Sequence, residues 1–168
     1  MTSAESAGHK RIDSAADAVA DERIQAFGVV LTAASRLERL LGAVMEHESG
    51  LSHPMFEVLL LLAARPEGAP MGDLSRSLVL TSGGATRLID RMIEAGLVRR
   101  ARSAEDKRVH VVTLTEAGSA KLVEAARRHA EEVDRHVFAV LPPAQATAVV
   151  TALDTLSTHA LEALPPLG

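Results

Sequence analysis

The sequence predicts a mainly α-helical chain with one small β-hairpin, an α+β fold. Apolar residues recur at three- and four-residue spacing over most of the 168 residues, which is the period of amphipathic helices. Two short runs of strand-forming residues flank a polar segment near residue 105, which is typical of a hairpin. Aromatic residues are limited to three Phe, so we expect a core built from Leu, Val, Ala and Met.

The N-terminal part begins polar and then becomes amphipathic. Residues 1–20 are rich in Ser and Ala, and we expect a disordered or weakly helical extension there. Residues 21–50 are expected to form one long helix, with Gly50 suited to the left-handed position that follows a helix. The apolar stripe of this helix consists of Ile24, Phe27, Leu31, Ala34, Leu37, Leu41 and Val44.

Three helices are expected between residues 51 and 96. The first begins near Pro54, since Pro is tolerated in a first turn, and it is apolar nearly all round, so it should be buried. A short helix over 71–77, a turn over 78–80 and a helix over 81–95 form a helix-turn-helix, which Gly96 ends. The last helix should turn one face inward, with Ala85, Leu88, Met92 and Ala95, and the opposite face outward, with Gly83, Thr86, Arg87 and Asp90.

A basic hairpin follows the helix-turn-helix. Strands are expected over 97–101 and 109–114, joined by the polar segment 102–108, and Thr115 suits the N-cap of the next helix. Between residues 71 and 111 basic side chains exceed acidic ones by three, whereas the whole chain has a net charge of −4. A helix followed by a locally basic hairpin is the layout of a winged helix-turn-helix. There the helix enters a DNA groove, while the hairpin touches the flanking backbone or minor groove.

These segments resemble the MarR family of bacterial transcriptional regulators. The resemblance rests on residues 51–59, 81–92, 94–98, 106–108 and 114–118. It implies a regulator, usually a repressor, that acts as a homodimer on pseudo-palindromic double-stranded DNA with half-sites ~34 Å apart. It also implies a small-molecule effector bound between the dimerisation helices and the winged helix, although no ligand-binding residue is identified.

The expected DNA contacts lie on the outward helix face and in the hairpin. Thr86 and Arg87 are expected to read base edges, and Gly83 to let the helix N-terminus approach a phosphate. Arg108 is expected to enter the minor groove, with its guanidinium held by a charge-assisted hydrogen bond to Asp106. The full set of expected DNA-binding residues is Thr81, Ser82, Gly83, Thr86, Arg87, Arg91, Arg102, Asp106, Lys107 and Arg108.

Two apolar seams follow the hairpin in the C-terminal region, residues 116–168. One helix is expected from Glu116 to about Val140, and another after Pro142-Pro143. The surplus apolar surface predicts that the N- and C-terminal helices pair across the two-fold axis of a dimer. An intramolecular bundle with residues 21–47 is the alternative. The seams consist of Val123, Ala126, Ala130, Val133, Val137 and Val140, and of Ala146, Val149, Leu153, Leu156, Ala160 and Ala163.

No combination of residues in the sequence indicates catalysis, so we expect neither an enzyme nor a cofactor. The absence of Cys excludes disulfides and Cys-ligated zinc. His129, Glu132 and His136 share one helix face, which is open to two interpretations. They form a zinc site, or they are solvated surface side chains, and we assign no metal site. A pH switch through His110, His129 and His136 is a further open alternative. The absence of a long apolar run predicts a cytoplasmic protein that does not enter the membrane.

A different class of function fits the same fold. Winged helices also serve as protein-interaction modules that do not bind DNA. Such a module has no need of Arg102, Lys107 and Arg108 beside a helix face that carries Thr86 and Arg87. The sequence therefore predicts a sequence-specific DNA-binding transcriptional regulator, with a protein-interaction module as the alternative.

Overall fold

The computed structural model describes residues 11–78, 82–103 and 109–164. The chain divides into two units, Met1–Leu40 and Leu41–Gly168. Helix α2, Glu22–Ser49, contributes to both of them. Each unit is described by itself below.

The first unit contains the short helix α1, Ala15–Ala20, and most of α2. The Ser14 hydroxyl caps α1 by accepting from the Asp17 amide at 3.1 Å. Asp21 lies between the helices and accepts from the amides of Arg23 and Ile24, which gives α2 an N-terminal cap. The Arg23 side chain also donates to this carboxylate, at 2.6 Å, and lowers the pKa of Asp21 to about 2.

The apolar stripe of α2 lies at the surface of the first unit. Ile24, Phe27 and Leu31 are each more than half exposed. Large apolar side chains placed together in this way are unfavourable in water and usually mark an interaction site. Most of the predicted apolar stripe that belongs to the first unit is therefore exposed.

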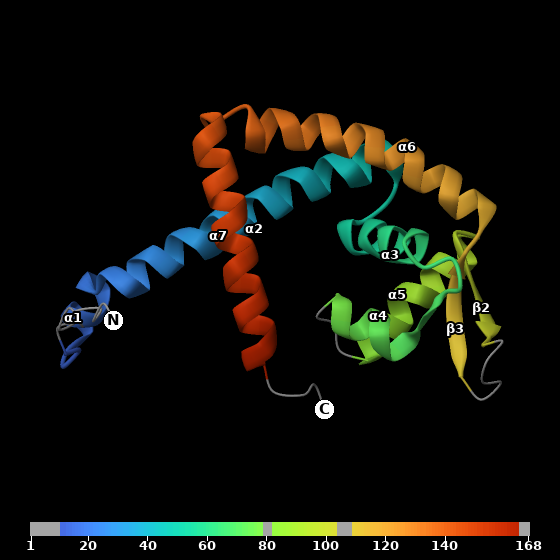
Figure 1. Cartoon of the computed structure of the whole chain (residues 1–168), viewed down its shortest axis with the longest axis horizontal. Coiled ribbons are helices and arrows are strands. Elements are labelled where there is room, and N and C mark those ends of the chain that lie inside the picture. The colour runs from blue at the N-terminus through green and yellow to red at the C-terminus, as the bar shows by residue number, and fades with distance from the viewer. Residues whose placement is uncertain (1–10, 79–81, 104–108, 165–168) are drawn as a thin grey trace, which may run out of the picture. The chain divides into compact units, whose positions relative to one another are not determined.

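The second unit contains the winged helix. Its helices are α3, His53–Ala63, α4, Met71–Ser77, and α5, Ser82–Glu94. Its strands are β1, Ala69–Pro70, β2, Val98–Arg102, and β3, His110–Leu114. Figure 1 shows α3, α5 and the β2–β3 hairpin packed together, with α6 running over α3. The two helices of the predicted helix-turn-helix and the paired strands of the hairpin are confirmed, while residues 79–81 and 104–108 of their connections lie outside the described residues.

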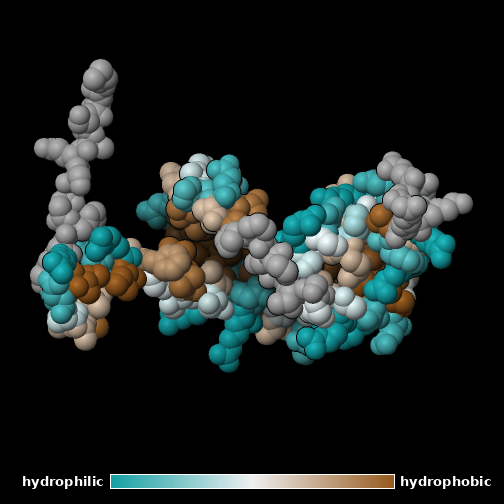
Figure 2. Space-filling model, turned by 90° about the horizontal axis from the view of Figure 1, so that it is seen from below, coloured by the Kyte–Doolittle hydropathy of each residue, from teal (hydrophilic) through white to brown (hydrophobic). Residues whose placement is uncertain are grey.

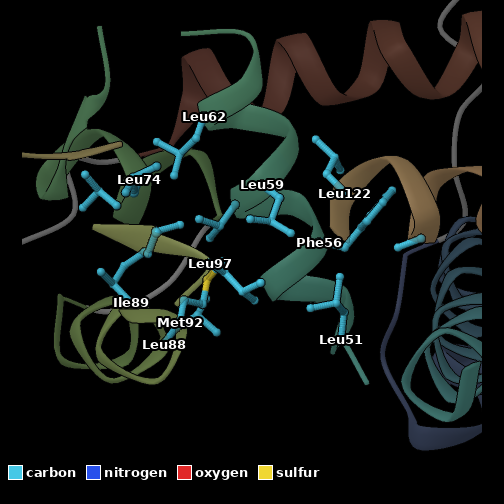
Figure 3. Packing of buried hydrophobic residues seen from close by; sticks show 14 of the residues in the cluster. Leu51, Phe56, Leu59, Leu62, Leu74, Leu88, Ile89, Met92, Leu97 and Leu122 are labelled. Atoms are coloured by element: carbon cyan, nitrogen blue, oxygen red, sulfur yellow. The ribbon is translucent and has the colours of Figure 1, made fainter. Parts of the chain in front are cut away.

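One hydrophobic core holds these elements together. Val58 and Leu59 of α3, Met92 of α5 and Val112 of β3 are fully buried. Figure 3 shows side chains from α3, α4, α5 and α6 converging on this core. Burial of one such side chain contributes about 1.5–3 kcal/mol. The predicted burial of α3 is only partly right, because Leu60 is 46% exposed and Glu57 and Ala63 are also exposed.

The inward face of α5 differs from the prediction at one position. Ala85, Leu88 and Met92 are buried as expected, but Ala95 is exposed and Ile89 is buried instead. The helix ends at Glu94, so Ala95 already belongs to the turn. Gly96, with φ of 71°, then reverses the chain, and the Leu97 amide donates to the Met92 carbonyl at 2.9 Å.

The sheet has three strands in the order β1-β3-β2, and the sequence did not predict β1. Ala69 pairs with Val112, and Val98 pairs with Leu114, both antiparallel. Gly68 enters β1 with φ of 90°, and a Cβ added there would lie 2.7 Å from the Val112 carbonyl oxygen. A strand of two residues shows no alternating pattern, which explains why the sequence did not reveal it.

The C-terminal region contains α6, Glu116–Val133, the π-helix η1, Asp134–Phe138, and α7, Pro143–Ala163. The prediction of one α-helix to Val140 is wrong, because the Ala139 amide bonds to the Asp134 carbonyl five residues earlier. Among the described residues, no single helix is long and apolar enough to cross a membrane. Only the pair 116–138 and 143–163, bent by 105° at its break, passes that test by length and composition.

Helix α6 has two apolar faces. Leu122 and Ala125 are buried and pack toward α3, whereas Val123 on the predicted seam is 48% exposed. The seam of α7 is also open, since Leu153 and Leu156 are about half exposed. Figure 2 shows hydrophobic surface, in brown, on helices outside the winged helix. One face of α6 thus packs in the hydrophobic core, and the adjacent face is exposed.

Candidate nucleic-acid interface

The outward face of α5 is polar and basic. Gly83, Thr86, Arg87 and Arg91 are all exposed. A Cβ added at Gly83 would meet nothing within 4 Å, so this part of the first turn of α5 is open to a bulky partner. The first turn of a helix carries backbone N–H groups without helical partners, which favour anions. The predicted outward face of α5 is confirmed.

Strand β2 places arginines beside this helix. Arg99, Arg100 and Arg102 are exposed, and alternate residues of a strand point to opposite faces. Arg99 donates from Nε to the Thr113 hydroxyl on β3, at 3.1 Å. Arg100 instead donates from Nη2 to the Asp90 carboxylate on α5, at 3.0 Å. Arg100 and Arg102 therefore share the strand face that adjoins α5.

Several expected DNA-binding residues lie outside the described residues. They are Thr81, Asp106, Lys107 and Arg108. Ser82 is the first residue of α5. The expected support of Arg108 by Asp106 therefore stays a prediction, while the structure places Gly83, Thr86, Arg87 and Arg91 at exposed positions of α5 and Arg102 at an exposed position of β2.

A rigid joint connects the end of α5 to the start of α6. The Thr115 hydroxyl can donate to the Gly96 carbonyl oxygen, at 2.7 Å, or to the Leu97 carbonyl oxygen, at 2.9 Å. It also accepts a hydrogen bond from the Gly118 amide at 2.9 Å. The Thr115 amide also donates to the Leu97 carbonyl, at 3.1 Å. The predicted N-cap is confirmed, and this joint fixes where α6 leaves the winged helix.

His129 and His136 of the C-terminal region each have a neighbour. The His129 ring lies 5.6 Å from that of His53 and 5.1 Å from that of Phe56. His136 lies 3.3 Å from Glu132, which also accepts from Arg135. In the described part of the chain, no group of three or more His, Asp or Glu side chains is placed to hold a metal ion.

A small hollow lies beside His129, between α6 and the end of α2. Its lining includes Leu41, Met45, Ser49, Ala125 and Glu132. Its free space is about 10 Å³, which is room for one water molecule. Pockets for small organic ligands are on the order of 300 Å³ or larger. An effector of that size therefore does not fit this hollow as it stands.

The sequence does not reveal the link between Asp90 and Arg100. The helix period puts Asp90 on the outward face of α5, but its partner lies on another element ten residues later. The two-residue period of β2 was the available signal, because it puts Arg100 and Arg102 on one face and Arg99 on the other. A helix period alone cannot show which strand residue lies beside a helix.

Sequence comparison relates the chain to transcriptional regulators. The sequence model of the MarR family matches residues 49–109. The HTH-type transcriptional regulator MhqR of Bacillus subtilis is 31% identical over 91 residues, which are 54% of this chain and 62% of MhqR. The chain spans about three fifths of the length of the curated relatives that it matches.

Solved structures share the fold over most of the chain. AbsC, a MarR family transcriptional regulator from Streptomyces coelicolor, has a TM-score of 0.74 at 25% identity, covering 90% of this chain and 98% of AbsC. CouR from Rhodococcus jostii RHA1, bound to p-coumaroyl-CoA, has a TM-score of 0.69 at 25% identity, covering 80% and 91%. The repressor CouR bound to a 23-mer DNA duplex has a TM-score of 0.62 at 26% identity, covering 74% and 89%.

Proposed function

We propose that the chain is a member of the MarR family and acts as a homodimeric transcriptional regulator, a repressor responsive to a small molecule, that binds specific double-stranded DNA. The observation that carries the proposal is the row of exposed arginines on α5 and β2, Arg87, Arg91 and Arg102. Arginine binds phosphate and guanine through a planar set of donors. The DNA-bound structure of CouR supports the same use of this fold.

In the proposed complex, α5 of each protomer enters a major groove and each hairpin reaches the neighbouring minor groove. Thr86 and Arg87 lie near the N-terminus of α5, where groove-reading side chains are found. The proposed DNA-binding set also includes four residues that only the sequence predicts, which are Thr81, Asp106, Lys107 and Arg108. Two-fold symmetry would then select a pseudo-palindrome with half-sites ~34 Å apart.

The proposed effector acts by changing the separation of the two α5 helices. A ligand shifts a conformational equilibrium only by binding one state more tightly than the other. The hollow at the end of α2 is small in this conformation, so a ligand there would have to open it. A shift of α6 would carry α5 with it through the joint at Thr115. The p-coumaroyl-CoA complex of CouR supports a ligand-responsive role.

The first test is selection of bound sequences from random duplex DNA, followed by binding measurements on Arg87→Ala. Arg87 is exposed on the outward face of α5. If its guanidinium donates to a guanine edge, the substitution costs about 1–3 kcal/mol of binding free energy. The expected result is also a relaxed preference at one position per half-site, measured by fluorescence anisotropy on single-base variants of the selected site.

Arg127→Ala provides the matched control. Arg127 is exposed on α6, so this variant removes the same charge from outside the proposed interface and should bind the selected site with unchanged base preference. An equal loss for Arg87→Ala on every sequence would identify Arg87 as a phosphate contact. A wild-type protein that enriches no sequence would contradict the proposed function and favour a protein-interaction module.

Gly83→Ala should separate folding from DNA binding. The added methyl group meets no atom of the protein within 4 Å, and alanine is a better helix former by about 1 kcal/mol. The thermal midpoint of unfolding should therefore hold or rise. Affinity for DNA should fall about tenfold, because the methyl group occupies space into which a phosphate would move. Unchanged affinity in the same preparation would show that this turn stays away from the DNA.

A further inference from the structure

An acidic side chain lies in the middle of the basic face of α5. Asp90 is three residues after Arg87 and directly before Arg91, and its side chain is 48% exposed. A carboxylate at this position repels the phosphates of a DNA groove. The Arg100 guanidinium on β2 lies against it, with Nη2 at 3.0 Å from Oδ1.

The ion pair is too exposed to serve chiefly in folding. The Arg100 side chain is 36% exposed, and ion pairs with that much water access contribute little to stability. Helix α5 and the sheet are instead held by buried residues such as Ile89, Met92 and Val98. The position of the pair, where α5 meets the hairpin, calls for another explanation.

Within the residues that the structure describes, the Arg100 guanidinium has donors left over for a second partner. Guanidinium carries five N–H donors, and the structure gives one Arg100 contact with Asp90. The neighbouring Arg99 is directed to Thr113 on the other side of the strand. Arg100 is thus held against the basic face of α5, at Asp90 between Arg87 and Arg91.

We infer that Arg100 is a phosphate-binding residue and that Asp90 is the positioning residue that holds it. The inference rests on the proposed function, and it assigns the site of a DNA backbone phosphate between the recognition helix and the hairpin. A side chain fixed before binding loses less conformational entropy when it meets its partner. Asp90 therefore improves binding through Arg100, although its own charge opposes it.

The test is a double-mutant cycle of Asp90→Asn and Arg100→Ala on the selected DNA site, measured over a range of salt concentrations. Arg100→Ala should weaken binding about tenfold on all sequences and lower the salt slope by about one phosphate equivalent. Asp90→Asn should weaken binding about threefold, against the electrostatic expectation. In the Arg100→Ala background, Asp90→Asn should no longer weaken binding.

A further variant and a folding measurement distinguish the ways in which the inference could fail. Arg100→Lys keeps the charge but lacks the planar guanidinium, and it should recover part of the affinity for DNA. Thermal unfolding of each variant shows whether it is folded. Tighter binding by Asp90→Asn at fixed salt would overturn the positioning role. A changed preference at one base pair would instead identify Asp90 as a reader of cytosine and overturn the inference. If the wild-type chain selects no DNA, both the proposed function and this inference are wrong.

Discussion

Gly118→Ala is expected to destabilise the protein by about 3 kcal/mol, even though alanine favours helices. A Cβ at Gly118 would lie 2.0 Å from the Leu97 carbonyl oxygen and 2.9 Å from its carbon. Both atoms belong to the backbone, so no side-chain rotation can relieve the clash. The first turn of α6 must move, and the hydrogen bonds from Thr115 to the Leu97 carbonyl are lost with it.

Thermal and denaturant unfolding measure this effect, with an expected fall in the midpoint of roughly 10 °C. Gly72→Ala is the matched control, because the nearest atom to its added Cβ is the end of the flexible Arg76 side chain, at 3.7 Å. This control should be neutral or slightly stabilising. A Gly118→Ala protein within about 0.5 kcal/mol of wild type would show that the joint yields easily.

Leu153→Asp is expected to convert the proposed dimer into monomers or aggregates. Leu153 is 45% exposed and lies with Val149 and Leu156 on the open seam of α7. In a symmetric dimer each substitution enters the interface twice. A carboxylate buried there without a partner costs several kcal/mol per copy. Sedimentation velocity at micromolar concentration should therefore show loss of the wild-type dimer. Val133→Asp on α6 is expected to act in the same direction.

Thr158→Asp tests whether charge alone produces the change. Thr158 lies on the opposite side of α7 from the seam and is exposed, so this variant should sediment as wild type does. A folded, stable wild-type monomer under the same conditions would contradict the dimer. It would also leave the open apolar faces of α2, α6 and α7 in need of another partner.

The winged helix was predictable because its local signals agree with its packing. The period of α5 identified three of its buried residues, and the capping residue Thr115 and the helix-ending Gly50 and Gly96 marked helix boundaries correctly. The hairpin was visible because its strands are apolar and its connection is charged. These features depend on residues close together in the sequence.

The features that were missed depend on residues far apart. The pairing of β1 with β3 joins Ala69 to Val112, and no pattern over two residues reveals it. Part of the seam that was predicted on α6 is exposed, at Val123 and Ala130, but the stripe that packs in the same chain contains Leu122 and Ala125. A helix with two apolar faces does not show from its sequence which face its own core uses. The same limit applies to the ion pair of Asp90 with Arg100.

The π-helix η1 rotates the residues that follow it about the helix axis, relative to where a continuous α-helix would place them. An i→i+5 turn contains one residue more than an α-helical turn, and one α-helical residue corresponds to about 100° of rotation. Val140 lies beyond η1, in the turn that leads to α7, and does not continue the helix that carries Val123 and Val133. Loss of a single residue within Asp134–Phe138 would let the α-helix continue and would turn the departure of α7 by about the same angle. In a two-fold assembly that rotation occurs in both copies, so the length of this turn sets the direction in which each protomer presents its last helix.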